Sequence, residues 1–521
     1  MTHVPSPPPR PARSRASTRL RRILLTTGLF AAFGGVPAVA DAPQPALAVG
    51  KLAQIGTVDA RFLSYNVEMV ELTGGRFWKP YREGKADPSD QYEYRPPIDL
   101  SNPRLRTLAA ALGPAYVRYS GTWANATTYR DEETHEGPAP EGFDAVLTRA
   151  QWRGAIDFAK AVDGRIVTSM PTSAGARDEN GAWQSDAAER WLAATHEMGG
   201  KIWASEFANE PNLIGGTQPP KGYTSADYRR DYTRFHDWLA ARSPQTRVLA
   251  PGAFEYRDGS PLPAFITTLP TREMVPNGPA RPDVVSFHFY GEISRRCAGP
   301  QPDPQGAAWL GMIDHAIVRT KTLRREIAPD APLWLTETAE TACGGNPQAA
   351  TFADTFRFVD QLARAARQGV SVVMHNTLAA SDYALLDEKS FAPRPNYWAA
   401  LLWKRTMGTR VLDAGSADAK SGLRLYAQCQ RGVAGGVSVL AINPDRTQPH
   451  DLALSGEAEV RSLTQAERDP ARAALNGTPL ELGAGDTLPD LAGLRRSGSV
   501  TLAPSSVTFL TFAKADNPAC R

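Results

Sequence analysis

The stretch "KIWASEFANE" (Lys201–Glu210) places a short apolar run directly before an asparagine and a glutamate. A run of this length, bounded by polar residues, is typical of a buried strand. Seven other runs of the same kind occur along the chain. They are "RFLSYNVEM" (Arg61–Met69), "AYVRYSG" (Ala115–Gly121), "RIVTSMP" (Arg165–Pro171), "RVLAPGA" (Arg247–Ala253), "VVSFHFY" (Val284–Tyr290), "LWLTET" (Leu333–Thr338) and "VSVVMHNT" (Val370–Thr377).

Segments of helical periodicity separate these runs. Apolar residues in them recur three and four positions apart, as on the buried face of a helix. One such set is Trp152, Ala155, Ile156 and Ala159. Strands that alternate with helices predict a parallel sheet, and eight such units predict a closed (β/α)8 TIM barrel in the α/β class.

Beyond about Thr409 the pattern changes to short alternating strands separated by Gly, Pro and Asp. Such strands are typical of an antiparallel β-sandwich. We therefore expect a catalytic barrel over 59–408 and a C-terminal β-sandwich domain over 409–521, to which a strand within 49–58 adds. The strand-like runs are "LRLYAQC" (Leu423–Cys429), "GVSVLAIN" (Gly436–Asn443), "HDLALSG" (His450–Gly456), "AEVRSLTQ" (Ala458–Gln465) and "SVTFLTFA" (Ser506–Ala513).

The first 40 residues differ from the rest in charge and hydropathy. They hold six arginines and no acidic residue, whereas the whole chain of 521 residues has a formal charge of only +3. A basic start, the apolar run Ile23–Phe33 and the small residues Ala38–Ala40 are typical of a secretory signal peptide over 1–40. The apolar run is too short to span a bilayer, so we expect a secreted or periplasmic protein without stable membrane insertion. The remaining chain is slightly acidic, and we expect no nucleic-acid partner.

Two glutamates end two of the predicted barrel strands. Glu210 ends the fourth and Glu337 the seventh, and barrel enzymes keep their catalytic groups at these strand ends. Facing carboxyl groups meet the requirement for cleaving a glycosidic bond, which needs one protonated acid and one carboxylate. Asn209 would then bind the sugar 2-hydroxyl, a contact that strengthens in the transition state. Pro211 is expected to help fix the turn that presents Glu210.

Several of these motifs together resemble the heparanase-like enzymes of glycoside hydrolase family 79. The similarity covers about Arg61 to the C-terminus. The motifs that carry it are "EFANEPN", "DVVSFHFY", "LWLTETAETACGG", "PNYWAALLWKRTMGTRVL" (Pro395–Leu412) and "LRTLAAALGPAYVRYSGT" (Leu105–Thr122). The resemblance implies a retaining β-glucuronidase with Glu210 as acid/base and Glu337 as nucleophile.

The resemblance also assigns substrate-binding residues. His288 and Tyr290 would lie around the nucleophile, and Thr122 and Glu68 at other strand ends. In the family a glycine-rich loop and a tyrosine hold the substrate carboxylate, which corresponds here to Gly344, Gly345 and Tyr383. Arg257 and Arg295 fall where the family carries sulfate-reading arginines. This sequence departs from the family at Glu68, which replaces an aspartate, at Val70, which replaces an asparagine, and at Ser381, which replaces a glycine.

The four cysteines suit two disulfides in an exported protein. A Cys297–Cys343 bond would clamp the loops after the sixth and seventh strands, and the family ties the sandwich as Cys429–Cys520 would. No cysteine spacing indicates a metal site, and we expect neither a metal nor a cofactor.

We expect a monomer that acts on a polysaccharide or oligosaccharide containing glucuronic acid. The favoured hypothesis is an endo-β-glucuronidase acting on heparan sulfate. Exo cleavage of terminal glucuronic acid, a non-catalytic carbohydrate-binding barrel and a glycosidase for neutral sugars remain as alternatives. Both carboxylates are present, which speaks against the non-catalytic alternative, and the acid-binding residues speak against neutral sugars.

Overall fold

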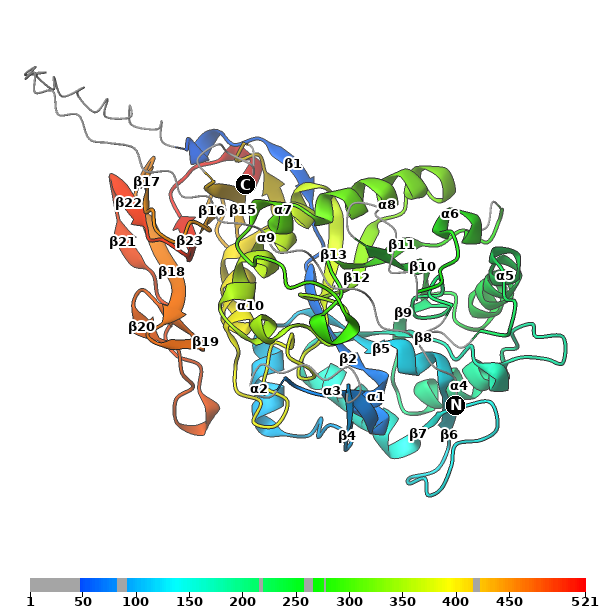
Figure 1. Cartoon of the computed structure of the whole chain (residues 1–521). Helices are drawn as coiled ribbons and strands as arrows, with labels where there is room; N and C mark the ends of the chain where they lie inside the picture. Colours follow the sequence, from blue (N-terminus) through cyan, green and yellow to red (C-terminus); the bar gives the residue numbers. More distant parts are fainter. Residues whose placement is uncertain (1–46, 82–90, 215–218, 257–265, 276–277, 416–421) are drawn as a thin grey trace, which may run out of the picture. The chain divides into compact units, whose positions relative to one another are not determined.

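The computed structural model describes residues 47–81, 91–214, 219–256, 266–275, 278–415 and 422–521. Eight parallel strands close into a barrel, which confirms the predicted architecture (Figure 1). Each strand overlaps one of the eight apolar runs. The strands are β2 (Leu63–Glu68), β5 (Ala115–Ser120), β8 (Gly164–Ser169), β9 (Ile202–Glu206), β10 (Arg247–Tyr256), β11 (Val284–Tyr290), β12 (Leu333–Thr338) and β13 (Val370–His375).

Helices connect the barrel strands and bury the apolar faces that their spacing predicts. On α3, for example, Trp152, Ala155 and Ile156 are fully buried. The helices are α1 (Met69–Thr73), α2 (Pro103–Ala111), α3 (Arg149–Ala161), α4 (Asp186–Glu197), α5 (Ser225–Arg242), α6 (Thr271–Met274), α7 (Ala307–Leu310), α8 (Ile313–Ile327), α9 (Ala353–Arg367) and α10 (Pro395–Thr406).

The C-terminal strands form an antiparallel sandwich, as predicted. Its larger sheet has nine strands: β1 (Gln54–Thr57), β14 (Met407–Leu412), β15 (Arg424–Gln430), β16 (Val437–Asn443), β18 (Ala458–Ala466), β19 (Asp469–Leu475), β20 (Thr478–Pro479), β21 (Leu494–Arg496) and β23 (Ser506–Phe512). The pair β17 (His450–Ala453) and β22 (Ser499–Leu502) packs on it, because Leu452 and Leu502 share an apolar core with Val439 and Leu510. The domain limits given above stay a prediction.

Two short ribbons accompany the barrel. Strands β3 (Gly75–Trp78) and β4 (Tyr92–Arg95) form an antiparallel hairpin after β2. Strands β6 (Thr127–Arg130) and β7 (Ala145–Thr148) pair in parallel. The hairpin becomes important below, because two of its aromatic side chains line the candidate site.

The inside of the barrel is divided into layers. Its floor is a cluster of buried apolar side chains, one or two from each of seven strands, in which the rings of Tyr116 and Trp334 lie 4.7 Å apart. Such filling makes the barrel a packed core and leaves chemistry to the carboxyl ends of the strands. The other members of the cluster are Val167, Ala204, Leu249, Val284, Val372 and Met374.

The predicted signal segment, 1–40, lies outside the described residues, and so does Arg257. A search of the described ranges finds no helix that is both long and apolar enough to cross a membrane. Export therefore stays a prediction, although the two disulfides reported below fit an oxidising compartment.

Candidate active site

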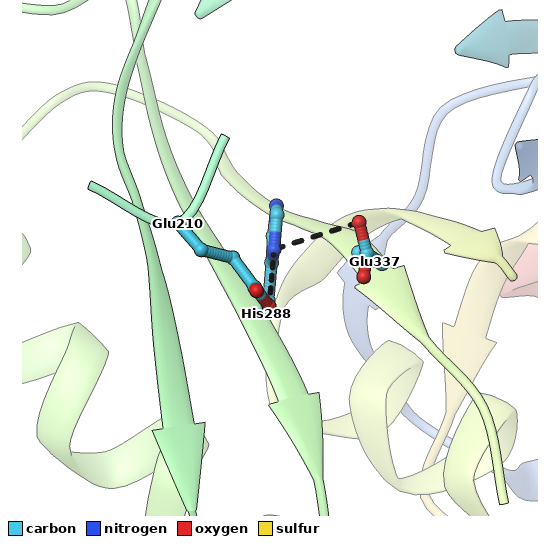
Figure 2. Close-up of side chains that lie close together, drawn as sticks. All are labelled: Glu210, His288 and Glu337. Carbon is cyan, nitrogen blue, oxygen red and sulfur yellow. Dashed lines mark hydrogen bonds and ion pairs between the residues drawn. The ribbon is translucent and has the colours of Figure 1, made fainter. Parts of the chain in front are cut away.

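Glu210 and Glu337 meet at the mouth of the barrel. Glu337 lies on β12, and Glu210 lies in the loop directly after β9. One oxygen of each carboxyl group and one nitrogen of His288 all lie within 4.8 Å of one another (Figure 2). Both glutamates are more than nine-tenths buried. The two strand-end carboxyl groups that the sequence singles out are therefore brought together.

The backbone at Glu210 adopts an unusual conformation. Its φ angle is +45°, in the left-handed region that non-glycine residues rarely use. The residue before a proline normally favours an extended conformation, so Pro211 alone does not explain this turn. The carbonyl of Glu210 accepts a hydrogen bond from the N–H of Leu213 at 2.9 Å, which helps to hold it. Strain of this kind persists where surrounding contacts fix the backbone.

Arg118, on β5, is the central cation of the site and was not among the predicted residues. Its guanidinium is fully buried and forms ion pairs with Glu206 at 2.8 Å and with Glu337 at 2.9 Å. It also donates to the Oδ1 of Asn209 at 2.7 Å. The sequence did contain a signal for Arg118: a charged residue lies inside the apolar run "AYVRYSG", and a buried charge requires a partner of opposite charge. Glu206 carried a similar signal, as a carboxylate inside the fourth run.

His288 lies between the carboxyl groups (Figure 2). Its Nδ1 is 3.1 Å from Glu210 and 3.7 Å from Glu337. Burial alone would lower the pKa of the imidazole, but the surrounding carboxylates, Glu337 foremost, raise that pKa to about 9. The ring is therefore protonated at neutral pH, and Nδ1–H donates to Glu210.

The other carboxyl groups of the site divide into two kinds. The pKa of Glu210 is raised by burial and by the negative charge of Glu337. Burial and Glu337 also raise the pKa of Glu68 well above its ordinary value. Burial acts the same way on Glu206, but the charge of Arg118 outweighs it and holds the pKa of Glu206 well below the usual range. Such separation of pKa values is typical of acid/base sites.

Charge balance follows from this division. Glu206 and Glu337 are paired as anions with the guanidinium of Arg118, and His288 supplies the second positive charge. The raised pKa values of Glu68 and Glu210 disfavour further negative charge in the cluster. Because isolated buried charges are costly, this arrangement is the one that the buried site can sustain.

Tyr290 and Asn376 form hydrogen bonds around the candidate nucleophile, Glu337. The hydroxyl of Tyr290 donates to Glu337 at 2.8 Å, and the amide of Asn376 donates to Glu68 at 3.0 Å and to the hydroxyl of Tyr383 at 3.3 Å. Burial raises the pKa of Tyr383 well above its ordinary value, so the phenol stays a donor. Asn376 directly follows β13 at the end of the eighth run and was missed, because an asparagine at a strand end is common in turns.

Gly344 and Gly345 form a tight loop after β12. Both have φ angles near +80°, and a side chain at Gly344 would collide with the ring system of Trp78. A side chain at Gly345 would meet the ring of Tyr383 at 3.1 Å. Among the described residues, none accepts a hydrogen bond from the backbone N–H groups of these two glycines. Adjacent N–H groups in left-handed backbone can bind an anion.

A cleft of about 440 Å³ opens over these groups. Aromatic and aliphatic side chains surround its carboxyl groups, as in most sites for small organic ligands. The described lining contains no lysine or arginine. It consists of Glu68, Trp78, Tyr92, Thr122, Trp123, Glu210, Leu213, Phe254, Ile266, Thr267, Tyr290, Ile293, Glu337, Ala342, Cys343, Asn376 and Tyr383.

Asn209 directly precedes Glu210 and is almost fully buried. Its backbone is held by two hydrogen bonds with the amide of Asn125, at 2.8 and 2.9 Å. Its own Nδ2 has no hydrogen-bond partner among the described residues. A buried donor without a partner is unusual and suits a contact with a substrate oxygen.

Of the two predicted sulfate-reading arginines, only Arg295 lies within the described residues, and it is not part of the described cleft lining. The side chain of Arg295 is exposed and donates to Gln301 at 3.2 Å. Its neighbour Arg296 is buried, pairs with Asp382 at 3.1 Å and lies over the ring of Tyr81. The role of Arg257 stays a prediction because that residue lies outside the described ranges.

Glu210, His288 and Glu337 have the spacing of a metal site. However, the guanidinium of Arg118 lies 2.9 Å from Glu337 and 3.2 Å from the imidazole. A fixed positive charge at that distance repels a divalent cation. The donor set therefore fits proton transfer better than metal binding.

Both predicted disulfides are present. Cys297 pairs with Cys343, and Cys429 pairs with Cys520. The first bond joins the loops after β11 and β12 beside the cleft, which Cys343 helps to line. The second ties β15 to the C-terminus of the sandwich.

Comparison with known proteins confirms the resemblance seen in the sequence. No family model matches the chain. Heparanase-like protein 1 of Arabidopsis thaliana is 26% identical over 389 residues, covering 70% of this chain and 68% of that protein. Heparanase of Mus musculus is 26% identical over 385 residues, covering 63% of this chain and 68% of that protein.

Solved structures share the fold at lower identity. The 4-O-α-L-rhamnosyl-β-D-glucuronidase of Fusarium oxysporum 12S is 13% identical, with a TM-score of 0.60 over 89% of this chain and 99% of that one. The likeness shows a barrel with a sandwich domain. The heparanase-like relatives support a glycoside hydrolase.

Proposed function

We propose that the protein is a retaining glycoside hydrolase that cleaves β-D-glucuronidic linkages, with endo cleavage of heparan sulfate as the expected activity. One observation carries the proposal: two buried carboxyl groups at strand ends, within 4.8 Å through their nearest oxygens, have opposite electrostatic surroundings. Glu337 is ion-paired with Arg118, and Glu210 has a raised pKa. Glu337 is thus suited to attack and Glu210 to donate a proton.

The spacing supports retention over inversion. Retaining enzymes hold their carboxyl groups about 5–5.5 Å apart, whereas inverting enzymes need about 6.5–9.5 Å to admit a water molecule. In the first step Glu337 bonds to the anomeric carbon, and Glu210 protonates the departing oxygen. In the second step water, deprotonated by Glu210, hydrolyses the glycosyl ester.

The change of role at Glu210 follows from the charges. The negative charge of Glu337 is one of the two main causes that raise the pKa of Glu210. When Glu337 becomes an ester, that charge disappears and the pKa of Glu210 falls. The imidazole of His288, 3.1 Å away, can then donate a hydrogen bond to the carboxylate that must act as base. The same pair of groups can therefore serve both steps.

The preference for a uronic acid rests on Tyr383 and the Gly344–Gly345 loop. The hydroxyl of Tyr383 and the N–H groups of Gly344 and Gly345 offer donors for a substrate carboxylate. Glu68 is close to these donors, and because burial and the charge of Glu337 raise its pKa well above the ordinary value, its repulsion of an anion is weakened. A neutral sugar would leave these donors unused.

Tyr383→Phe tests this preference. Losing one charge-assisted hydrogen bond costs about 1.5–3 kcal/mol, which is roughly ten- to hundredfold in kcat/KM. We expect that loss for an aryl β-glucuronide and little change for an aryl β-glucoside. An equal loss on both substrates would remove the basis for glucuronic acid specificity.

Digestion of heparan sulfate with size analysis separates the alternatives. Fragments of intermediate size support endo cleavage, and released monosaccharide supports exo cleavage. A carbohydrate-binding protein without activity would bind the polysaccharide and leave its size unchanged.

A further inference from the structure

The hairpin β3–β4 presents two aromatic rings to the cleft. Trp78 and Tyr92 face each other across the hairpin, and their rings stack with centroids 4.6 Å apart. Both residues line the cleft and are only partly buried. A partly exposed pair of flat rings inside a substrate cleft offers a surface for the apolar face of a sugar ring.

Contacts from two loops hold the hairpin in place. Buried Arg296, which follows β11, donates to the carbonyl of Lys79 and lies 4.1 Å from the ring centroid of Tyr81. The same guanidinium pairs with Asp382, which also accepts from the N–H of Tyr81 at 3.2 Å. Gln91, at the start of the returning strand, donates to the carbonyl of Arg296 at 2.8 Å. The aromatic pair is therefore a fixed wall.

The position of this wall indicates which part of a substrate it meets. Trp78 packs directly on Gly344, beside the donors proposed for the uronic acid carboxylate. Glu210, which would protonate the departing oxygen, belongs to the loop after β9 with Leu213. The departing part of the substrate lies on the Glu210 side. The carbon that bears the 4-oxygen is bonded to the carbon that carries the carboxylate, so a sugar linked to that oxygen lies next to the carboxylate donors and Trp78.

We propose that Trp78, supported by Tyr92, forms the subsite for the sugar linked to the 4-oxygen of the cleaved glucuronic acid, and that this subsite takes an uncharged pyranose ring by stacking. The inference rests on the proposed function. Among the described lining residues, which include no cationic side chain, the attraction that Trp78 and Tyr92 offer is stacking. A sugar with an apolar face and no sulfate group suits that surface.

The experiment compares substrates of different length. The wild type, Trp78→Ala and Trp78→Phe are assayed with an aryl β-glucuronide and with an unsulfated oligosaccharide of alternating N-acetylglucosamine and glucuronic acid. Trp78→Ala should lower kcat/KM roughly tenfold more on the oligosaccharide than on the aryl glucuronide, as expected for one lost stacking contact. Trp78→Phe keeps a ring and should recover most of the loss.

Tyr94→Ala supplies the matched control. Tyr94 lies two residues after Tyr92 on β4, is 70% exposed and is not part of the described cleft lining, so both substrates should be cleaved as by the wild type. Equal losses on both substrates in Trp78→Ala, or a gain on the oligosaccharide, would overturn the proposal. A gain would make Trp78 a barrier that enforces exo cleavage. A wild type that cleaves no glucuronide would instead refute the proposed function.

Discussion

The floor and the mouth of the barrel are built from the same strands and differ in chemistry. On β5, Tyr116 faces the floor and Arg118, two residues later, faces the mouth. On β9, Ala204 and Glu206 are related in the same way. Period-two alternation decides that all four side chains point inward, and position along the strand decides their depth. A shift of two residues thus separates a purely structural layer from a reactive one.

The two layers also differ in how they are stabilised. Each apolar side chain in the floor stabilises the folded protein independently, because its surface is removed from water. A charged side chain at the mouth is tolerated in the folded protein only together with its partners, because a buried charge without a counter-charge costs free energy of folding. Changes in the floor should therefore affect folding alone, whereas changes in the mouth should affect folding, activity and pH dependence together.

The largest expected effect is on turnover in the mouth. Glu337→Gln removes the proposed nucleophile and should lower kcat by about 10⁴-fold or more. Glu255→Gln changes a carboxylate on β10 that pairs with Arg319 outside the described cleft lining, and it should leave kcat near the wild-type value. A fluorinated glucuronide should label Glu337 covalently in the wild type. Labelling of another residue would contradict the assignment.

The second-largest expected effect is a loss of unfolding free energy when the buried ion pairs at the mouth are broken. Arg118→Met leaves the carboxylates of Glu206 and Glu337 buried without a cation, which should cost about 3–5 kcal/mol of unfolding free energy. The double variant Arg118→Met/Glu206→Gln should recover part of that loss. Arg165→Met, which changes a half-buried arginine over the ring of Trp203, should cost about 1 kcal/mol. Chemical denaturation of the three variants measures the difference, and equal losses would reject the central role of Arg118.

A floor substitution should separate stability from chemistry. Leu249→Ala removes a fully buried side chain from the floor and should cost about 2–5 kcal/mol of unfolding free energy. The fraction that remains folded should keep the wild-type kcat and pH profile. A shifted pH profile would mean that the two layers are coupled.

The smallest expected effect is a pH dependence of stability. The pKa of His288 is raised from 6.5 to about 9, so its contribution is fully present below pH 6.5 and is lost as the pH rises through 9. The loss should not exceed about 3 kcal/mol, given 1.36 kcal/mol for each pKa unit. Unfolding free energies of the wild type and of His288→Asn between pH 6 and 10 measure it. Parallel curves for the two proteins would contradict a protonated His288.

Much of the fold could be predicted from the sequence because its signals are local. Each barrel strand is a compact apolar run, and each covering helix repeats apolar residues at helical spacing, as on α3 (Arg149–Ala161). The two strand-end glutamates could be found for the same reason. Their roles needed the family resemblance, because a single strand-end carboxylate also suits a solvated loop.

Other parts of the site could not be predicted because they depend on distant contacts. Arg118 pairs with Glu337 across 219 sequence positions, and Asn376 reaches Glu68 across 308. The role of Trp78 depends on packing against Gly344, which no local pattern reveals. For Arg295 the family resemblance implied sulfate binding; its exposed side chain contacts Gln301, and the predicted role stays a prediction. Long-range pairing thus decides which residues of the mouth act together.

The configuration of the first product tests the central claim most directly. An aryl β-glucuronide is cleaved by the wild type, and the glucuronic acid released is followed by proton NMR before its anomers equilibrate. A double displacement at Glu337 with Glu210 as acid and base predicts the β-anomer first, since two inversions restore the starting configuration. Initial release of the α-anomer would contradict the account, because it requires direct attack by water between the two carboxyl groups.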